Sequence, residues 1–200
     1  MTIKHWFVAL LLMAMAAHAN AQSPLDVVQG AADLLSQRLE GRKDELRANR
    51  PALYALINDI LLPRFDRDYA AQLVLGRYWR SASDDQRKRF VESFYSALLH
   101  RYADGVLDYD ESKIEILPYR GGDDERTMVR TVVTLDDGTK VPVNYALVKR
   151  DSGWLMFDVT IEGISYVRNF RAELNSEIQE KGLDSVIARL EAEAASNGVS

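Results

Sequence analysis

The chain has 200 residues, a formal net charge of −5 and no cysteine. This length suits one domain with a sizeable core, and the lack of cysteine excludes disulfides, thiol catalysis and a lipidated N-terminal cysteine. The acidic balance argues against nucleic acid as a partner, because phosphate binding needs a concentrated basic surface.

The N-terminus has the pattern of a signal peptide. Lys4 and His5 precede an apolar run at 6–17, and Ala19-Asn20-Ala21 fits a small-x-small cleavage site. Twelve apolar residues are too few to cross a bilayer. We therefore predict export, with a signal peptide at 1–21 and one domain at 22–200. Cleavage removes a single basic residue, so 24 basic and 30 acidic residues remain and the net charge becomes −6.

The first half of the predicted domain has helical periodicity. Apolar spacing predicts helices over 25–48, 51–63 and 66–76, the second opened and closed by proline and the third stopped by glycine. Ser83 and Gln86 form a capping box for a fourth helix, which carries a broad aromatic face. Four helices are thus expected before the first strand.

The second half alternates apolar and polar residues, which predicts an antiparallel meander of four strands over 112–119, 126–135, 140–150 and 154–161. Turns are predicted at Asp136–Gly138 and Asp151–Gly153. Two helices follow, over 165–180 and 183–194. Helices, then strands, then helices indicate an α+β domain with helices packed on one face of a twisted antiparallel sheet.

Side chains able to perform catalysis are scarce. His100 is the only histidine after residue 21, and the nucleophile motif Gly-x-Ser-x-Gly is absent. A zinc site or a Ser–His–Asp site is therefore not expected. The acidic pairs at 66 and 68 and at 84 and 85 stand where helix N-caps are expected.

Asp158 is a carboxylate inside a strand rich in large apolar side chains. We interpret it as a solvent-facing residue or as an ion-pair partner of Arg168 or Arg171, with general-base catalysis as the alternative. The apolar content of the helices and strands fits either a dense core or a ligand cavity, and composition does not separate the two.

Several short stretches resemble the MlaC family, periplasmic phospholipid carriers also called toluene-tolerance or ABC transporter auxiliary proteins. The first stretch is "LLPRFDRDYAAQLVLGRYWRSASDDQRKRFVESFYSALLHRY", with Pro63-x-Phe65-Asp66, Leu75-Gly76-x-x-Trp79, Gln86-Arg87, Phe90, Phe94 and Tyr102. The second is "FDVTIEGISYVRNFRAEL", with Asp158, Glu162-Gly163-Ile164-Ser165 and Asn169-x-Arg171, followed by a last helix over 183–190. The similarity covers nearly all of 22–200 in order.

The resemblance implies a function in the periplasm of Gram-negative bacteria. Such carriers move phospholipid between an outer-membrane lipoprotein–porin complex and an inner-membrane ABC transporter, which maintains outer-membrane lipid asymmetry. It also implies a cone-like fold of the nuclear-transport-factor type, with a lipid cavity between sheet and helices. We expect a monomer without enzymatic activity or cofactor, with phospholipid as cargo.

The expected cavity walls are the inward faces of the helices and strands. We predict these lipid-binding residues: Leu75, Phe94, Leu98, Val129, Val133, Tyr145, Phe157, Val159 and Tyr166. Strand alternation would put Phe157, Val159 and Ile161 on one face, although an error of one residue inverts the assignment. Gly163 and Gly182 would serve as hinges that let the helix between them swing.

Two alternatives stay open at this point. One is a small enzyme of the cone fold, an isomerase or dehydratase with Asp158 as base and Tyr145 as electrophile. The other is an envelope interaction module with a filled core and no ligand.

Overall fold

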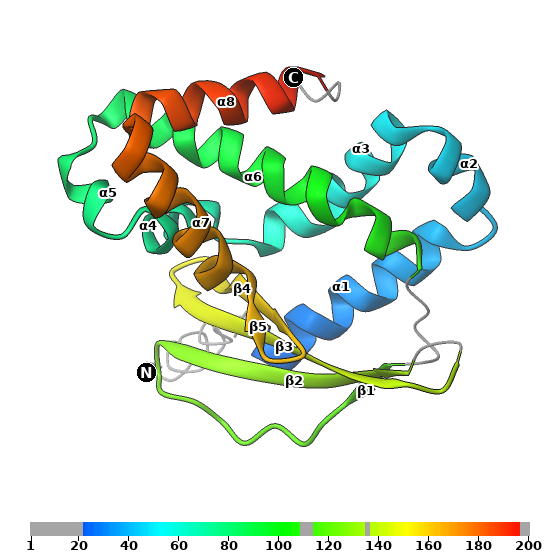
Figure 1. The fold of residues 1–200 in the computed structure, drawn as a ribbon. Coiled ribbons are helices and arrows are strands. Elements are labelled where there is room, and N and C mark those ends of the chain that lie inside the picture. Colours follow the sequence, from blue (N-terminus) through cyan, green and yellow to red (C-terminus); the bar gives the residue numbers. More distant parts are fainter. Residues whose placement is uncertain (1–21, 109–113, 135–136, 197–200) are drawn as a thin grey trace, which may run out of the picture.

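The computed structural model describes residues 22–108, 114–134 and 137–196. The predicted signal peptide at 1–21 and Asp136 of the first predicted turn lie outside the described residues. The described helices lie on one side of a five-stranded antiparallel sheet (Figure 1). The predicted α+β class with helices on one face of an antiparallel sheet is thus confirmed, whereas the cone-like shape stays a prediction.

The helices follow the predicted order with two differences. Their bounds are α1 (Pro24–Leu39), α2 (Lys43–Ala48), α3 (Arg50–Leu61), the 3-10 helix η1 (Leu62–Arg64), α4 (Arg67–Leu75), α5 (Arg77–Ser81), α6 (Asp84–Leu107), α7 (Tyr166–Lys181) and α8 (Leu183–Ser196). The single predicted helix over 25–48 is wrong, because Gly41 takes a φ of 67° and separates α1 from α2. The short helix α5 was not predicted.

Side chains cap the helices where the sequence predicts it. The Asp66 carboxylate accepts a hydrogen bond from the Tyr69 amide at 2.9 Å and caps α4. The capping box of α6 is complete, because the Ser83 side chain accepts from the Gln86 amide and the Gln86 side chain accepts from the Ser83 amide. An N-cap of this kind contributes about 1 kcal/mol to stability.

Gly76 lies between α4 and α5, at a contact between the two stretches of the chain that resemble the MlaC family. Its backbone has φ 54° and ψ −113°, and the Arg171 guanidinium of α7 packs directly against it. A Cβ at this position would come within 2.9 Å of Arg171 Nη2. Glycine is therefore needed here for its backbone conformation and for the close approach of α7.

We expect Gly76→Ala to destabilise the protein by about 1–3 kcal/mol, because an L side chain is strained at this backbone conformation. Urea denaturation measures the change as a lower midpoint. The double variant Gly76→Ala/Arg171→Ala removes the steric contact but keeps the strain, so it should recover part of the loss. Full recovery of stability in the double variant would contradict the argument from backbone strain. An unchanged stability of Gly76→Ala would contradict both the strain and the steric contact with Arg171.

The sheet has the strand order β1-β2-β3-β4-β5, so every strand pairs with its sequence neighbours. The bounds are β1 (Ile114–Ile116), β2 (Arg126–Thr134), β3 (Lys140–Arg150), β4 (Gly153–Ile161) and β5 (Ile164–Ser165). The four predicted strands are all present, and the two-residue β5 is added at one edge. Both outer strands are therefore short.

A β-bulge interrupts the alternation of β4. Ala146 lies opposite Asp158 and Leu147 lies opposite Met156, so Phe157 has no partner on β3. The strict alternation predicted for 157–161 therefore does not hold at Phe157. The Phe157 ring instead meets the ring of Tyr69 edge-on, with 5.0 Å between centroids.

Three groups of buried side chains hold the layers together. The first joins α4, α6, α7 and α8 around Phe90, Phe94 and Phe170. The second joins α1, α2 and α3 to the C-terminal half of α6. The third packs the first turns of α1 on Val129 and Leu147 of the sheet. The sheet is thus attached to the helical layer through α1, through the β4–α7 connection, and through the segment between η1 and α4, where the Asp66 amide donates to the Met156 carbonyl at 2.7 Å.

Candidate ligand-binding site

The helix-facing side of the sheet changes from closed to open along its strands. At one end Val129, Leu147 and Met156 are buried in the group formed with α1. Residues opposite each other on antiparallel strands share a face. On this face the other end carries side chains that are only half-buried, and we call them the apolar trough: Ile114, Ile116, Val133, Val141, Tyr145, Val159 and Ile161.

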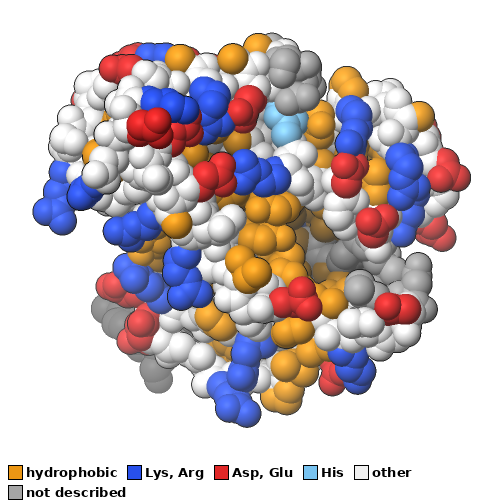
Figure 2. All heavy atoms as spheres, viewed as in Figure 1, with side chains coloured by type: hydrophobic (Ala, Val, Ile, Leu, Met, Phe, Trp, Pro, Cys, Tyr) orange, Lys and Arg blue, Asp and Glu red, His pale blue; other side chains and the backbone are white. Residues whose placement is uncertain are grey.

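The helical layer presents apolar side chains of the same kind. Leu98 and Tyr102 of α6 and Tyr166 of α7 are half-buried. Tyr102 and Tyr166 stack with 4.0 Å between ring centroids and 11° between ring planes. Figure 2 shows hydrophobic side chains gathered around a hollow in the middle of the molecule, between the helices and the sheet. Apolar surface left open in such a hollow marks a place where another apolar group can bind.

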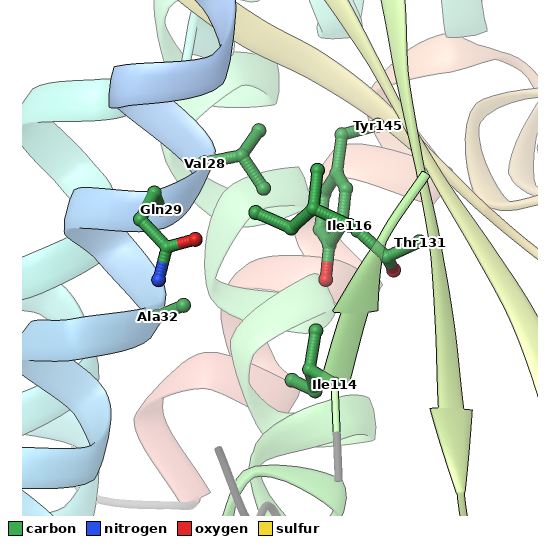
Figure 3. A pocket seen from close by; sticks show the side chains of 7 residues that line it. All are labelled: Val28, Gln29, Ala32, Ile114, Ile116, Thr131 and Tyr145. Carbon is green, nitrogen blue, oxygen red and sulfur yellow. The ribbon is translucent and has the colours of Figure 1, made fainter. Parts of the chain in front are cut away.

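A small cavity lies between α1 and the first three strands (Figure 3). It is lined by Val28, Gln29 and Ala32 of α1, and by Ile114, Ile116, Thr131 and Tyr145 of the sheet. Its volume is about 100 Å³. This is the space of roughly three water molecules, whereas pockets for drug-sized ligands measure roughly 300–1,000 Å³. Tyr145 belongs to both the cavity and the trough, so the two spaces share a wall.

The polar groups at the cavity are few and uncharged. Thr131 is buried and its hydroxyl donates to the Val143 carbonyl at 2.9 Å. Burial raises the pKa of the Tyr145 phenol, and a hydrogen bond with Thr131 offsets part of that shift. The phenol is therefore neutral at physiological pH. A wall of this kind accepts an apolar ligand without recognising a charge.

The structure separates the predicted lipid-binding residues into two groups. Leu75, Phe94 and Val129 are at most 1% exposed and lie inside the packed groups of the core. The others are half-buried: Leu98, Val133, Tyr145, Phe157, Val159 and Tyr166. Of all nine, Tyr145 alone is among the residues that line the cavity. Val159 lies opposite Tyr145.

Helix α1 supplies three cavity residues that sequence reasoning missed. Val28, Gln29 and Ala32 line the cavity on the side opposite the strands, and Ala32 points its methyl group toward the sheet (Figure 3). The sequence shows α1 as an amphipathic helix, but nothing in its pattern says which element covers which strand. The available signal was the run of small residues Gly30-Ala31-Ala32 within the apolar pattern of this helix.

Asp158 has structural hydrogen bonds on both of its carboxylate oxygens. Oδ2 accepts from the Ser165 hydroxyl at 2.5 Å and Oδ1 accepts from the Val167 amide at 3.0 Å. The prediction that Asp158 faces solvent or pairs with an arginine is therefore wrong, since it holds the start of α7. Tyr145 lines the cavity below α1, so the structure does not bring the proposed base and electrophile to one site.

His100, the histidine of α6, has its two ring nitrogens buried without a hydrogen-bond partner among the described residues. Its ring meets Tyr54 of α3 edge-on, with 4.7 Å between centroids. Burial lowers the pKa of His100, and the charge of Glu193 opposes the shift. His100 is thus a packed neutral side chain between helices, and it lies outside the cavity lining.

This environment makes the protein sensitive to acid. Because the folded state lowers the pKa of His100, the unfolded chain binds a proton near its ordinary pKa of about 6.5 while the folded protein does not. The free energy of unfolding should therefore fall as the pH is lowered from about 7 to about 5. His100→Phe keeps the ring contact with Tyr54 and should flatten this dependence in urea titrations. An equal slope in both proteins would contradict the assignment.

Two kinds of feature are absent from the residues that the structure describes. In that part of the chain, no group of three or more His, Cys, Asp and Glu side chains could hold a metal ion. Within the same residues, no helix is both long and apolar enough to cross a membrane.

Comparison with known proteins identifies the family. The family model described as "MlaC protein" matches residues 29–192. The chain belongs to the MlaC family. Toluene tolerance protein ttg2D of Pseudomonas putida is 32% identical over 165 residues, which are 82% of this chain and 77% of that protein. The intermembrane phospholipid transport system binding protein MlaC of Haemophilus influenzae is 25% identical over 203 residues, or 96% of this chain and 94% of that protein.

A solved structure has the same fold. The phospholipid-binding protein of Ralstonia solanacearum, solved in complex with a phospholipid, superposes with a TM-score of 0.76. It is 24% identical and covers 88% of this chain and 98% of that chain. In this MlaC-family chain the quoted motifs have structural roles: Asp66 caps α4, Gly76 receives Arg171, and Asp158 binds the first turn of α7.

Proposed function

We propose that this protein binds a phospholipid with its acyl chains in the apolar trough and the adjoining cavity. The observation that carries the proposal is the open, half-buried face of the sheet beneath α1 and α6, in a chain of the MlaC family. Named relatives support it, since one is a phospholipid transport system binding protein and another was solved with phospholipid.

The free energies of the possible contacts favour the acyl chains over the headgroup as the source of affinity. Burying one methylene yields about 0.8 kcal/mol, so two sixteen-carbon chains contribute on the order of 20 kcal/mol before the costs of binding. Hydrogen bonds to a phosphate add far less, at about 1–3 kcal/mol each. Headgroup selectivity should therefore be weak, and unassisted release into water should be very slow.

The cavity volume sets a condition on this mode of binding. A space of about 100 Å³ cannot contain two acyl chains. The chains must therefore lie largely in the trough, or α1 must move away from β1 and β2 when lipid enters. α7 is the less suitable moving wall, because Phe170 and Leu174 are fully buried against its neighbours.

The proposed cellular role is that of a periplasmic carrier without enzymatic activity. We propose that residues 1–21 direct export and that 22–200 form one phospholipid-binding domain, acting as a monomer. Its lipid would pass between an inner-membrane ABC transporter complex and an outer-membrane lipoprotein–porin complex, so that lipid asymmetry is maintained. The hydrogen bonds on both oxygens of Asp158 count against the alternative of a small isomerase or dehydratase.

Protein purified from a bacterial periplasm without added lipid is expected to contain diacyl phospholipid. Extraction into organic solvent followed by mass spectrometry measures the amount per protein and the headgroups. Because apolar contacts dominate, the headgroups should follow the composition of the host membrane. Lipid-free protein from every preparation would refute the proposal, and a single headgroup from a mixed membrane would refute the binding mode.

A further inference from the structure

The connection between β4 and α7 contains a short relay of hydrogen bonds that starts at Asp158. Its carboxylate accepts from the Ser165 hydroxyl at 2.5 Å and from the Val167 amide at 3.0 Å. The Ser165 oxygen in turn accepts from the Arg168 amide at 3.1 Å. Ser165 is only 4% exposed. One strand carboxylate thus fixes both the cap and the first turn of α7.

Few other contacts hold the turn between β4 and β5. The link passes through a turn in which Glu162 and Gly163 have φ values of 50° and 83°. A Cβ placed on Gly163 would meet no other atom within 4 Å, and Ile164 is 61% exposed. Besides the two-residue pairing of β5 with β4 and the hydrogen bond from the Glu162 amide to the Pro142 carbonyl at 3.0 Å, the described hydrogen bonds that keep this connection against the sheet are those of Asp158.

Tyr166 lies between the two residues that Asp158 binds. Its ring stacks on Tyr102 of α6, with 4.0 Å between centroids. β5, which directly precedes Tyr166, pairs with Thr160 and Ile161 at the half-buried end of β4. The stacked tyrosines therefore connect the helical layer to the sheet at the open end of the trough. The next turn of α7 is held independently, because Phe170 is fully buried against Phe94.

We propose that Asp158 is a positioning residue for lipid retention. It acts through Ser165 and the Val167 amide to keep Tyr166 stacked on Tyr102, and this aromatic pair closes one end of the trough against the escape of acyl chains. The proposal rests on the proposed function and adds a residue that controls release at that site. Asp158 itself does not touch the lipid.

The test compares five single variants and one double variant with the wild type. Asp158→Ala and Ser165→Ala remove the relay, and Tyr166→Ala removes the ring that the relay positions. Ser83→Ala removes a comparable N-cap from α6, at the end of that helix away from Tyr102. The release rate of Ser83→Ala therefore shows how much the loss of a helix cap alone changes lipid release. Each protein is loaded with a phosphatidylethanolamine that carries one pyrene-labelled chain, and release is followed into unlabelled vesicles of phosphatidylethanolamine and phosphatidylglycerol.

We expect Asp158→Ala and Ser165→Ala to release the labelled lipid about fivefold faster than the wild type, which corresponds to roughly 1 kcal/mol. Tyr166→Ala should accelerate release to the same extent. The double variant Asp158→Ala/Tyr166→Ala should release lipid no faster than the faster of the two single variants, because both changes remove the same contact of Tyr166 with Tyr102. Ser83→Ala should release lipid at the wild-type rate. Asp158→Asn retains an acceptor oxygen and should lie between the wild type and Asp158→Ala.

Three results would overturn this proposal while leaving the proposed function intact. Wild-type release rates in Ser165→Ala, which removes only a hydroxyl, would show that the relay does not control retention. Multiplying effects of Asp158→Ala and Tyr166→Ala would show that they act separately, and equal acceleration by Ser83→Ala would show a general effect of lost stability. A wild-type protein that takes up no labelled lipid would overturn the proposed function as well, so the two failures are distinguishable.

Discussion

Ala32→Phe is expected to lower the phospholipid bound per protein at least about tenfold while leaving the protein folded. If the new ring displaces only two methylenes of the lipid, the binding free energy already falls by about 1.6 kcal/mol. Ala32 points into the cavity of about 100 Å³ below α1. A slightly larger apolar cavity, of about 150 Å³, accommodates a benzene ring. The new side chain therefore fills the space between α1 and the sheet, and overpacking costs about 1–3 kcal/mol of stability.

Gln37→Phe is the matched control for this experiment, since it adds the same ring to an exposed position of α1. Its lipid content, measured by extraction and mass spectrometry, should equal that of the wild type. Thermal melting of both variants shows whether the fold persists. Wild-type lipid content in Ala32→Phe would mean that the acyl chains do not use this cavity.

Phe94→Ala is expected to destabilise the protein by about 3–5 kcal/mol, as is usual for loss of a fully buried aromatic ring. Phe94 is 0% exposed, stacks on Phe90 at 5.7 Å and meets Phe170 edge-on at 5.3 Å. The change leaves a cavity at the contact of α6 with α7. Urea denaturation measures the loss as a lower midpoint with an unchanged slope.

Leu98→Ala provides the comparison, because Leu98 is on the same helix but only half-buried. It should lose less stability than Phe94→Ala and more of its bound lipid. The reverse pattern, with a stable Phe94→Ala protein that lacks lipid, would make Phe94 part of the lipid site and would support the sequence-based assignment.

Phe94 and Leu98 show which part of the site can be predicted from the sequence and which part cannot. Helical periodicity placed Phe94 and Leu98 on the apolar face of α6, and that face is indeed the one that packs. It could not tell which of the two lies against another helix and which lies beside an open space. That distinction depends on the positions of α7 and the sheet, which are set by tertiary packing and have no local signature.

Local chemistry was the more reliable guide. The caps at Asp66 and Ser83 and most of the strands follow from side-chain hydrogen bonding and alternation within a few residues. The bulge at Phe157 was missed because it arises from the mismatch between β3 and β4 and leaves the composition of β4 unchanged. The relay from Asp158 was missed for a similar reason, since its partner Ser165 follows a turn.

The short outer strands have a consequence for a protein whose sheet carries half-buried apolar side chains. An exposed strand edge is a template on which a second chain can add, and apolar sheets aggregate by this route. Here the outermost strands are β1 with three residues and β5 with two. Beyond β5, the edge of β4 is bridged at Met156 by Phe65 and by the Asp66 amide. An incoming chain therefore meets only short lengths of unpaired edge, and we expect the protein to release an apolar ligand without polymerising.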